Sequence, residues 1–315
     1  MRIAYDHQIF SLQPYGGISR YFVELASRVA SDPDFGVRIV APMHLNQLLR
    51  SNDAVPVRGT YVPHFRGTGV LRLLSNSIAS RLHLLTAGVD LIHETYYTRE
   101  RIAPRGIPTV VTVFDMIHER FPQSFNARSA TRSRKRAAIT RASRILCISD
   151  STRRDLLEEI PIDPARISVV PLAADPGLVL LAAPDRLIAA PYVLYVGQRR
   201  GYKNFDACLD AFVASGLPDR GVIFVCFGGG ALTEIDRQGV QKAGLPDAAV
   251  VHLGGGDDVL ATLYQHAEAF IYPSLYEGFG IPPLEAMVCG CPVICSRTSS
   301  LPEVVGTAAE MFNPC

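Results

Sequence analysis

Short runs of apolar residues recur along the first half of this chain and alternate with stretches in which apolar positions return every three or four residues. Runs that are almost wholly apolar predict strands buried on both faces, and strands that alternate with helices predict a parallel sheet covered on two sides. Helical spacing is clearest at 18–30 and 69–85. The predicted strands lie at 2–6, 37–41, 89–94, 107–115, 144–149 and 167–175.

The same pattern restarts in the second half, after a looser stretch at 176–191 that we interpret as a linker. A helix is expected near 204–215, and strand-like runs at 192–197, 222–227, 249–254 and 268–274 each lead into glycines or a turn. We therefore predict an α/β chain with two doubly wound domains, residues 1–175 and 176–315. Ligands of such sheets bind beyond the carboxyl ends of the strands, which points to the crevice between the domains.

Composition narrows the class of protein. The 315 residues are 48% hydrophobic and 19% charged, typical of a globular protein with two cores, and the net charge of +1 gives no general argument for nucleic acid binding. Charged residues interrupt the first apolar run, and no later run approaches the roughly 18 apolar residues that a membrane span needs. We expect no signal peptide and no membrane span. The seven cysteines are scattered without a C-x-x-C pair, which favours a reduced, cytoplasmic protein without a zinc site.

The most informative stretch is 269–296. An apolar strand leads into Gly278 and Gly280, a proline pair sets the first turn of a short helix, and Gly290 is placed for a left-handed C-terminal cap. Two carboxylates, Glu277 and Glu285, flank the loop with seven residues between them. The glycines and prolines exclude one continuous helix, so the loop can fold both acids toward one cleft. Taken singly, Glu285 also fits an acid that complements a helix dipole, and Glu277 a solvated loop acid.

The string E-G-F-G-I-P-P-L-E at 277–285 resembles the two-glutamate motif of the retaining GT-B glycosyltransferases of family 4. The resemblance extends from Met1 to Cys315, and it implies the GT-B fold, in which two Rossmann-like domains face a central cleft. In that family the chain continues beyond the segment that matches 313–315. The resemblance therefore implies that the C-terminal domain is incomplete here.

The resemblance also implies roles for individual residues of the second domain. Glu277 would hold the donor sugar together with nearby backbone N–H groups, and Glu285 would bind the ribose hydroxyls. In V-G-Q-R-R-G-Y-K-N-F-D (196–206), Arg199 and Lys203 would neutralise the diphosphate, with Arg200 as the alternative to Arg199. Basic residues after a strand are also common on solvated surfaces, and glycines are common in tight turns for conformation alone. The other implied donor-binding residues are Gly197, Gly228, Gly229, Leu253, Gly254, Phe279, Gly280 and Ile281.

In the first domain, P-Y-G-G-I-S-R-Y-F resembles the glycine-rich loop of the family, which implies that Gly16 and Gly17 approach the phosphates and acceptor. A helix-initiating turn explains the same glycines. Many relatives carry histidine directly before the aspartate of the segment V-T-V-F-D, where this chain has Phe114. We predict that Asp115 and His118 line the acceptor side of the cleft as catalytic residues, with a structural histidine as the alternative for His118.

The stretch 127–144 holds seven cations and no acid. A helix of this kind could lie against anionic lipid or receive a phosphate-bearing acceptor, and a solvated helix face is the structural alternative. The cations are Arg128, Arg132, Arg134, Lys135, Arg136, Arg141 and Arg144. Peripheral contact with the inner face of a membrane is a hypothesis from this pattern.

These observations predict a metal-independent, retaining hexosyltransferase that needs no cofactor besides its nucleotide diphosphate sugar, with a glycan or lipid-linked acceptor. The likeness is greatest to bacterial mannosyl- and glucosyltransferases of surface-polysaccharide assembly, which makes mannose from GDP-mannose the first expectation. Two alternatives stay open, a non-catalytic nucleotide-sugar-binding subunit and a nucleotide-sugar epimerase of the same fold. A nicotinamide-linked enzyme is disfavoured, because no G-x-G-x-x-G follows the first strand.

Overall fold

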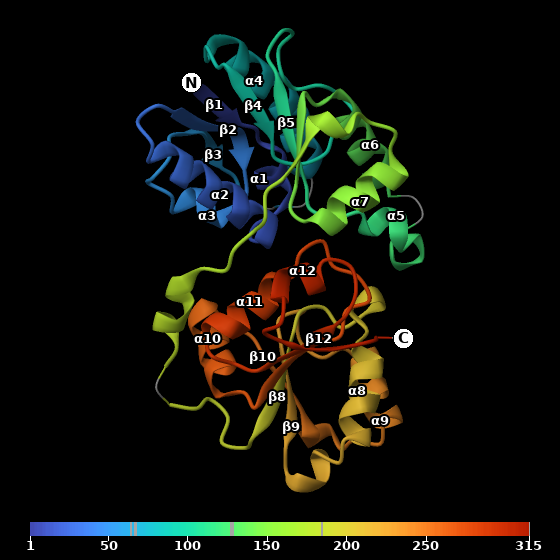
Figure 1. The fold of residues 1–315 in the computed structure, drawn as a ribbon. Coiled ribbons are helices and arrows are strands. Elements are labelled where there is room, and N and C mark those ends of the chain that lie inside the picture. Colours follow the sequence, from blue (N-terminus) through green and yellow to red (C-terminus); the bar gives the residue numbers. More distant parts are fainter. Residues whose placement is uncertain (64, 66–67, 127–128, 184, 315) are drawn as a thin grey trace. The chain divides into compact units, whose positions relative to one another are not determined.

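The computed structural model describes residues 1–63, 65, 68–126, 129–183 and 185–314. The chain forms two compact units (Figure 1). The predicted domain boundary after residue 175 stays a prediction, but three segments that precede it, 114–127, 148–156 and 169–175, belong to the second compact unit. The first unit comprises Met1–Val113, Arg128–Cys147 and Leu157–Ser168, and the second comprises Phe114–Ala127, Ile148–Leu156 and Val169–Cys315.

In the described part of the first unit, seven strands form one sheet in the order β3-β2-β1-β4-β5-β6-β7. Pairing is parallel from β3 through β6, as the apolar runs predict. The strand order reverses between β1 and β4, which makes the sheet doubly wound. The strands are β1 (Arg2–Tyr5), β2 (Gly36–His44), β3 (Val57–Tyr61), β4 (Leu91–Glu94), β5 (Thr109–Val113), β6 (Arg144–Cys147) and β7 (Ile167–Val169).

Two helices of this half begin and end close to the predicted positions. The two clearest helical patterns correspond to α2 (Gly17–Ala30) and α4 (Thr68–Thr86). None of the helices in the described residues is both long enough and apolar enough to cross a membrane. The others are α1 (Gln8–Leu12), α3 (Gln47–Arg50), α5 (Ile117–Arg120), α6 (Thr131–Arg141) and α7 (Asp150–Glu159).

The second unit repeats the design. Its described strands form a six-stranded, wholly parallel sheet in the order β10-β9-β8-β11-β12-β13, with the reversal between β8 and β11. The strands are β8 (Tyr192–Val196), β9 (Ile223–Phe227), β10 (Val250–Leu253), β11 (Ala269–Tyr272), β12 (Val293–Ser296) and β13 (Glu310–Phe312). The helices are α8 (Phe205–Ala214), α9 (Glu234–Lys242), α10 (Asp257–His266), α11 (Ile281–Val288) and α12 (Leu301–Val305).

The stretch predicted as a linker is partly structured. It begins with a 3-10 helix, Pro176–Leu181, that packs against α10 and α11. Leu178 is 4% exposed and joins the core that Leu194 and Phe270 form on one face of the second sheet. This segment therefore adds to the second core, as the apolar residues of 178–181 allow.

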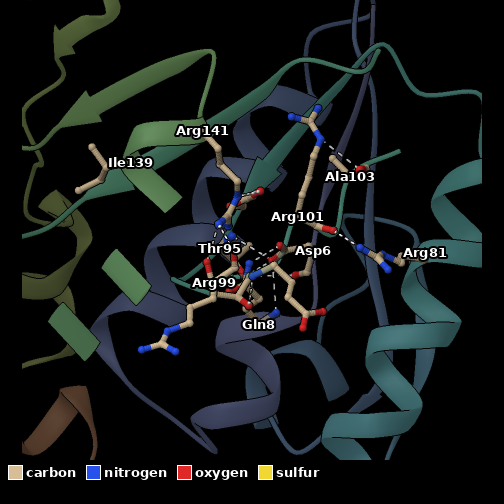
Figure 2. A network of polar contacts seen from close by, with 12 residues as sticks. Asp6, Gln8, Arg81, Thr95, Arg99, Arg101, Ala103, Ile139 and Arg141 are labelled. Carbon is tan, nitrogen blue, oxygen red and sulfur yellow. Dashed lines mark hydrogen bonds and ion pairs between the residues drawn. The ribbon is translucent and has the colours of Figure 1, made fainter. Parts of the chain in front are cut away.

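Polar residues at the carboxyl ends of β1 and β4 form a buried network in the first unit (Figure 2). Asp6 Oδ2 accepts a hydrogen bond from Gln8 Nε2 at 2.7 Å, and Asp6 Oδ1 accepts from both N and Oγ1 of Thr95, at 2.9 and 2.7 Å. Asp6 is fully buried, so these bonds replace the water that the carboxylate loses. The network joins the loops that follow two adjacent central strands.

A second part of this network involves Arg141, at the end of α6. Its Nη2 lies 2.6 Å from Oε2 of Glu94, whose side chain is fully buried, and its Nη1 donates to the carbonyl oxygens of Thr98 and Arg99 (Figure 2). Burial raises the pKa of Glu94 to about 7, although the hydrogen bond and charge of Arg141 act in the opposite direction. Arg141 is thus a structural cation and not part of a solvated basic face.

We expect Arg141→Ala to lower the free energy of unfolding by about 3–5 kcal/mol, because it leaves a buried carboxylate without its counter-ion. The loss should be larger at pH 8 than at pH 5. Without Arg141, the pKa of Glu94 in the folded protein rises further above its pKa in the unfolded chain. The free energy of unfolding therefore falls as the pH rises from the unfolded pKa toward the folded pKa. Urea unfolding at both pH values measures this. Exposed Arg132→Ala is the control, and equal effects of the two substitutions would contradict the assignment.

Candidate functional site

The loop at 273–280 joins β11 to α11, and two of its glycines have physical reasons to be there. A Cβ at Gly278 would lie 1.8 Å from the carbonyl oxygen of Phe114, so no side chain fits. Gly280 has φ +112°, a region that L side chains rarely adopt, and it caps α11. Pro282 follows in the first turn of the helix, as predicted. The glycines and prolines therefore fix where the strand ends and how the helix begins.

This loop lies at the topological switch point of the second sheet. The strand order reverses between β8 and β11, and the segments that follow these strands are 197–203 and 273–280. In open parallel sheets, ligands bind in the crevice at the carboxyl ends of the strands on either side of such a reversal. The fold thus brings the predicted phosphate segment and the two-glutamate loop to one place.

Lys203 and Glu277 form a close ion pair at this place. Lys203 Nζ lies 2.6 Å from Glu277 Oε1 and donates to the hydroxyl of Tyr272 at 3.2 Å. The two charged side chains are only 15% and 12% exposed. Lys203 Nζ also lies 5.2–5.3 Å from the ring centres of Tyr202 and Tyr272. The cation therefore sits between aromatic faces and one carboxylate, in a largely desolvated position.

Glu285 is held in a similar way on α11. The hydroxyl of Tyr264, from α10, donates to Glu285 Oε2 at 3.3 Å. Burial and then the charge of Glu285 raise the pKa of Tyr264, and burial and then Glu277 raise that of Tyr272. Both tyrosines therefore stay protonated at neutral pH and can act as hydrogen-bond donors. Each of the two predicted acids has a buried tyrosine beside it.

Asp115 and His118 lie in the segment Phe114–Ala127, which belongs to the second unit. Cβ of Asp115 is 3.0 Å from the Cβ position of Gly278, so this residue adjoins the two-glutamate loop. Asp115 Oδ1 accepts from the backbone N–H of Ile117 at 3.0 Å, and the ring of His118 stacks on Phe125 with centroids 4.0 Å apart. The structure therefore brings Asp115 close to the loop that carries Glu277, and it places His118 in an aromatic contact.

Arg199 has different surroundings from those expected of a diphosphate ligand. Its side chain is 2% exposed, and Nε lies 3.4 Å from Oδ2 of Asp236. The guanidinium donates to three carbonyl oxygens of the loop after β9, those of Gly228, Gly230 and Ala231, at 2.7–3.0 Å. Burial alone would raise the pKa of Asp236, but hydrogen bonds from Thr233 and the charge of Arg199 lower it. Arg199 thus holds the glycine loop, and its part in diphosphate binding stays a prediction.

The alternative cation, Arg200, is exposed, and its Nη2 donates to the Thr233 hydroxyl at 3.0 Å. The neighbouring strand ends are linked by backbone contacts. Gly197 N donates to Phe227 O at 2.9 Å, and Nε2 of His252 lies 3.2 Å from Gly228 O. The predicted donor-binding glycines Gly197, Gly228 and Gly229 therefore lie at the carboxyl ends of neighbouring strands of the second sheet. Leu253 ends β10 in the same sheet, and Gly254 follows it.

Gly16 and Gly17 lie in the first unit, where they begin α2. The carbonyl oxygen of Gly16 accepts hydrogen bonds from Ser19 Oγ and Arg20 N in the first helical turn, both at 2.9 Å. A Cβ at Gly16 would lie 2.6 Å from Oε1 of Gln13, whereas one at Gly17 would meet nothing within 4 Å. These contacts agree with a helix-initiating turn, and an approach to phosphates stays a prediction.

Sequence reasoning missed the two tyrosines beside the acids. Tyr264 and Tyr272 read as apolar positions of a helix and a strand. Glu285, which accepts from Tyr264, lies 21 residues away, and Lys203, which donates to Tyr272, lies 69 residues away. Nothing in the local pattern marks such partners. Among the described residues, no group of three or more His, Cys, Asp or Glu side chains could hold a metal ion. Metal independence stays a prediction.

Arg199→Ala should destabilise the second unit by about 3–5 kcal/mol, because it leaves Asp236 without its counter-ion and three loop carbonyls without their donor. Arg199→Lys should recover only part of this, since lysine lacks the guanidinium fork. Arg200→Ala should change the free energy of unfolding by less than about 0.5 kcal/mol. Chemical denaturation of the three variants distinguishes a structural arginine from a ligand-binding one. An Arg199→Ala variant of normal stability would contradict the structural role.

Two known families match this chain over separate stretches. Residues 15–178 match the family described as Glycosyltransferase Family 4, and residues 188–312 match Glycosyl transferases group 1. The O-antigen chain mannosyltransferase B of Escherichia coli is 32% identical over 188 residues, which are 56% of this chain and 49% of that protein. The chain thus spans about half the length of this relative, and 24% of a second, the serotype-specific mannosyltransferase WbdA of Escherichia coli.

A longer match covers most of the chain. The O-antigen chain mannosyltransferase RfbU of Salmonella typhimurium is 25% identical over 95% of this chain and 83% of that protein. Among solved structures, WaaG, a glycosyltransferase involved in lipopolysaccharide biosynthesis, superposes with a TM-score of 0.73 at 20% identity, over 99% of this chain and 86% of that chain. This likeness confirms the predicted GT-B fold of two Rossmann-like domains. With its first family match spanning more than half of its length, the chain belongs to glycosyltransferase family 4.

Proposed function

We propose that this chain transfers a hexosyl group from a nucleotide diphosphate sugar to a glycan or lipid-linked acceptor, with retention of configuration and without a metal ion. Family membership and the names of the relatives support glycosyl transfer. The single observation that carries the proposal is the Lys203–Glu277 pair, 2.6 Å apart at the switch point of the second sheet. A cation and a carboxylate so placed suit the two halves of a sugar nucleotide, phosphate and sugar hydroxyls.

The pair also suggests how the donor enters. Glu277 neutralises Lys203, so neither charge is buried alone. A diphosphate oxygen would replace Glu277 as the acceptor of the hydrogen bond from the Lys203 ammonium group. The freed Glu277 carboxylate could then accept hydrogen bonds from the sugar. Glu285, on the neighbouring helix, would accept hydrogen bonds from the ribose hydroxyls.

In the proposed reaction, the bond between C1 of the sugar and the β-phosphate oxygen breaks, and the electron pair leaves with the diphosphate. Lys203 stabilises the negative charge that develops on the leaving diphosphate. The Lys203 side chain is already fixed in place, so the reaction step needs no rearrangement of this side chain. The acceptor hydroxyl attacks C1 on the same face and forms the new carbon–oxygen bond. Its proton passes to the departing phosphate oxygen, so no separate protein base is required.

Mannose is the sugar that we propose first, with GDP as its carrier. The support is that several relatives are named mannosyltransferases, two of them of the O-antigen chain. We propose a surface polysaccharide or its lipid-linked precursor as the acceptor for the same reason. The base of the nucleotide is the least constrained part, since it would meet backbone groups near Leu253 and Gly254.

A thermal-shift series with GDP-, UDP- and ADP-sugars tests the donor. We expect one class to raise the melting temperature, because a ligand that binds only the folded state stabilises it. Lys203→Met should weaken binding of that donor by about 10- to 100-fold, which corresponds to the loss of one charge-assisted hydrogen bond. Lys242→Met, a change at an exposed lysine, is the matched control.

Two outcomes would contradict the proposal. A chain that none of the sugar nucleotides stabilises has no donor site of this kind, and an unchanged affinity in Lys203→Met removes the ion pair from the site. Donor binding without transfer or hydrolysis would favour a non-catalytic subunit. Interconversion of two sugar nucleotides would favour an epimerase.

We also propose peripheral contact between the exposed cations of α6 and an anionic membrane. Arg132, Arg134 and Arg136 are exposed, whereas Lys135 is 1% exposed and lies 5.8 Å from the ring centre of Tyr97. Arg141 is used internally, and Arg128 lies outside the described residues. The available basic surface is therefore smaller than the sequence pattern suggests.

Vesicle cosedimentation tests this contact. Three juxtamembrane cations at about 1 kcal/mol each predict binding to anionic vesicles that is stronger by roughly 100-fold than to neutral ones. The triple variant of Arg132, Arg134 and Arg136 to Gln should lose this preference. Equal binding to anionic and neutral vesicles would contradict the proposal.

A further inference from the structure

The backbone of Glu277 is held by side chains on both of its polar groups. Its N–H donates to Ser299 Oγ at 2.8 Å, and its carbonyl oxygen accepts from Ser300 Oγ at 2.9 Å. Ser300 Oγ also lies 2.7 Å from the carbonyl oxygen of Phe279, two residues further along. Ser300 is fully buried. Two consecutive serines before α12 thus bind the loop at the residue that carries the proposed sugar-binding carboxylate.

The next carbonyl group is held from a different segment. Ser149 Oγ lies 2.7 Å and Thr152 Oγ1 3.1 Å from the carbonyl oxygen of Gly278. Both hydroxyl residues are buried, at 2% and 0% exposed, and they start α7 in the stretch Ile148–Leu156 of the second unit. Because Gly278 cannot carry a side chain, its carbonyl can approach this helix closely.

Tyr276, the residue before Glu277, is also held by side-chain and backbone partners. The hydroxyl of Tyr276 donates to Asp155 Oδ2 at 2.6 Å and accepts from the backbone N–H of Met116 at 3.2 Å. Asp155 in turn pairs with Arg120 at 2.7 Å. Burial and then the hydrogen bond to Asp155 raise the pKa of Tyr276, so its hydroxyl stays a donor. Residues 276, 277 and 278 each have a side-chain partner from outside the loop.

The backbone at Ser299 is strained. Its φ of +49° lies in the left-handed region, which in the described residues only Asn204 shares among non-glycine residues. Such a conformation costs about 1–3 kcal/mol and persists where the surroundings fix it, often at functional sites. At this position the strain brings Ser299 Oγ to the N–H of Glu277.

We propose that Ser149, Thr152, Ser299, Ser300 and the Tyr276–Asp155 pair are positioning residues for Glu277. They fix its backbone and so hold the carboxylate beside Lys203, where it can meet the donor sugar once a diphosphate oxygen has replaced it at Lys203. The inference rests on the proposed function. Each of these residues contacts residues 276–279 of the loop, whereas the nucleotide half of the proposed site depends on Lys203 and Glu285. Loss of a positioning residue should therefore affect recognition and transfer of the sugar more than binding of the nucleoside diphosphate.

Three substitutions test the proposal, with a fourth as control. Ser300→Ala and Thr152→Val remove loop-holding hydroxyls from opposite sides, and Thr152→Ser retains one. Ser274→Ala changes a buried serine of the same loop whose hydroxyl has no hydrogen-bond partner among the described residues. We expect kcat to fall by about 10- to 100-fold in Ser300→Ala and Thr152→Val, since small misplacements of a reacting geometry cost this much. Affinity for the nucleoside diphosphate alone should change by less than about threefold, and Thr152→Ser and Ser274→Ala should resemble the parent protein.

A double-substitution cycle with Glu277→Gln separates positioning from general destabilisation. If Ser300 acts through Glu277, Ser300→Ala should cause little further loss of kcat once Glu277 is already changed. Equal losses in both backgrounds would overturn the proposal. So would variants of Ser300 and Thr152 that behave like Ser274→Ala.

Amide hydrogen exchange provides a readout that does not depend on activity. The amides of 276–281 should exchange faster in Ser300→Ala and Thr152→Val than in the parent or Ser274→Ala, at unchanged melting temperature or after correction for it. Unchanged exchange in this segment would overturn the positioning role even if the chain transfers sugar. Faster exchange in a chain that transfers no sugar would instead reject the proposed function and leave the loop-holding contacts standing.

Discussion

One close approach of two backbones governs the proposed site. The carbonyl oxygen of Phe114, after β5, occupies the space where a side chain at 278 would begin. Only glycine permits this contact, and with it the loop after β11 comes within reach of the hydroxyls that start α7. The direction of Glu277, its pairing with Lys203 and the start of α11 all follow from the path that the loop then takes.

Arg141 and Arg199 differ from Lys203 in their surroundings. Arg141 and Arg199 are bound by a carboxylate and by several backbone carbonyls, so their donors are used within the fold. Lys203 has one carboxylate, one hydroxyl and two aromatic faces, a set of partners that a phosphate can replace more readily. The chemistry of the partners, more than burial, distinguishes a structural cation from one that suits a ligand.

The parallel sheets, several helices and the loop with its glycines and prolines were predictable, because apolar runs and backbone-restricted residues are local signals. The edge strand β3, with Arg58, Gly59 and Thr60 at its centre, lacks such a run and was missed. The pairing of Glu277 with Lys203 was expected only as proximity, and the internal use of Arg199 was not expected. Both depend on residues 29 to 74 positions apart, a separation at which sequence pattern carries no geometric information.

The membership of 114–127 and 148–156 in the second compact unit has a practical consequence for recombining relatives of this family. A chimera spliced at a single point near residue 175 would combine a loop from one parent with the α7 hydroxyls and the Phe114 backbone from another. Compatible hybrids would need to inherit three separated segments from the same parent. Recombination at the ends of those segments should preserve the geometry of the loop. A single crossover would place contacting segments from two different parents in one unit.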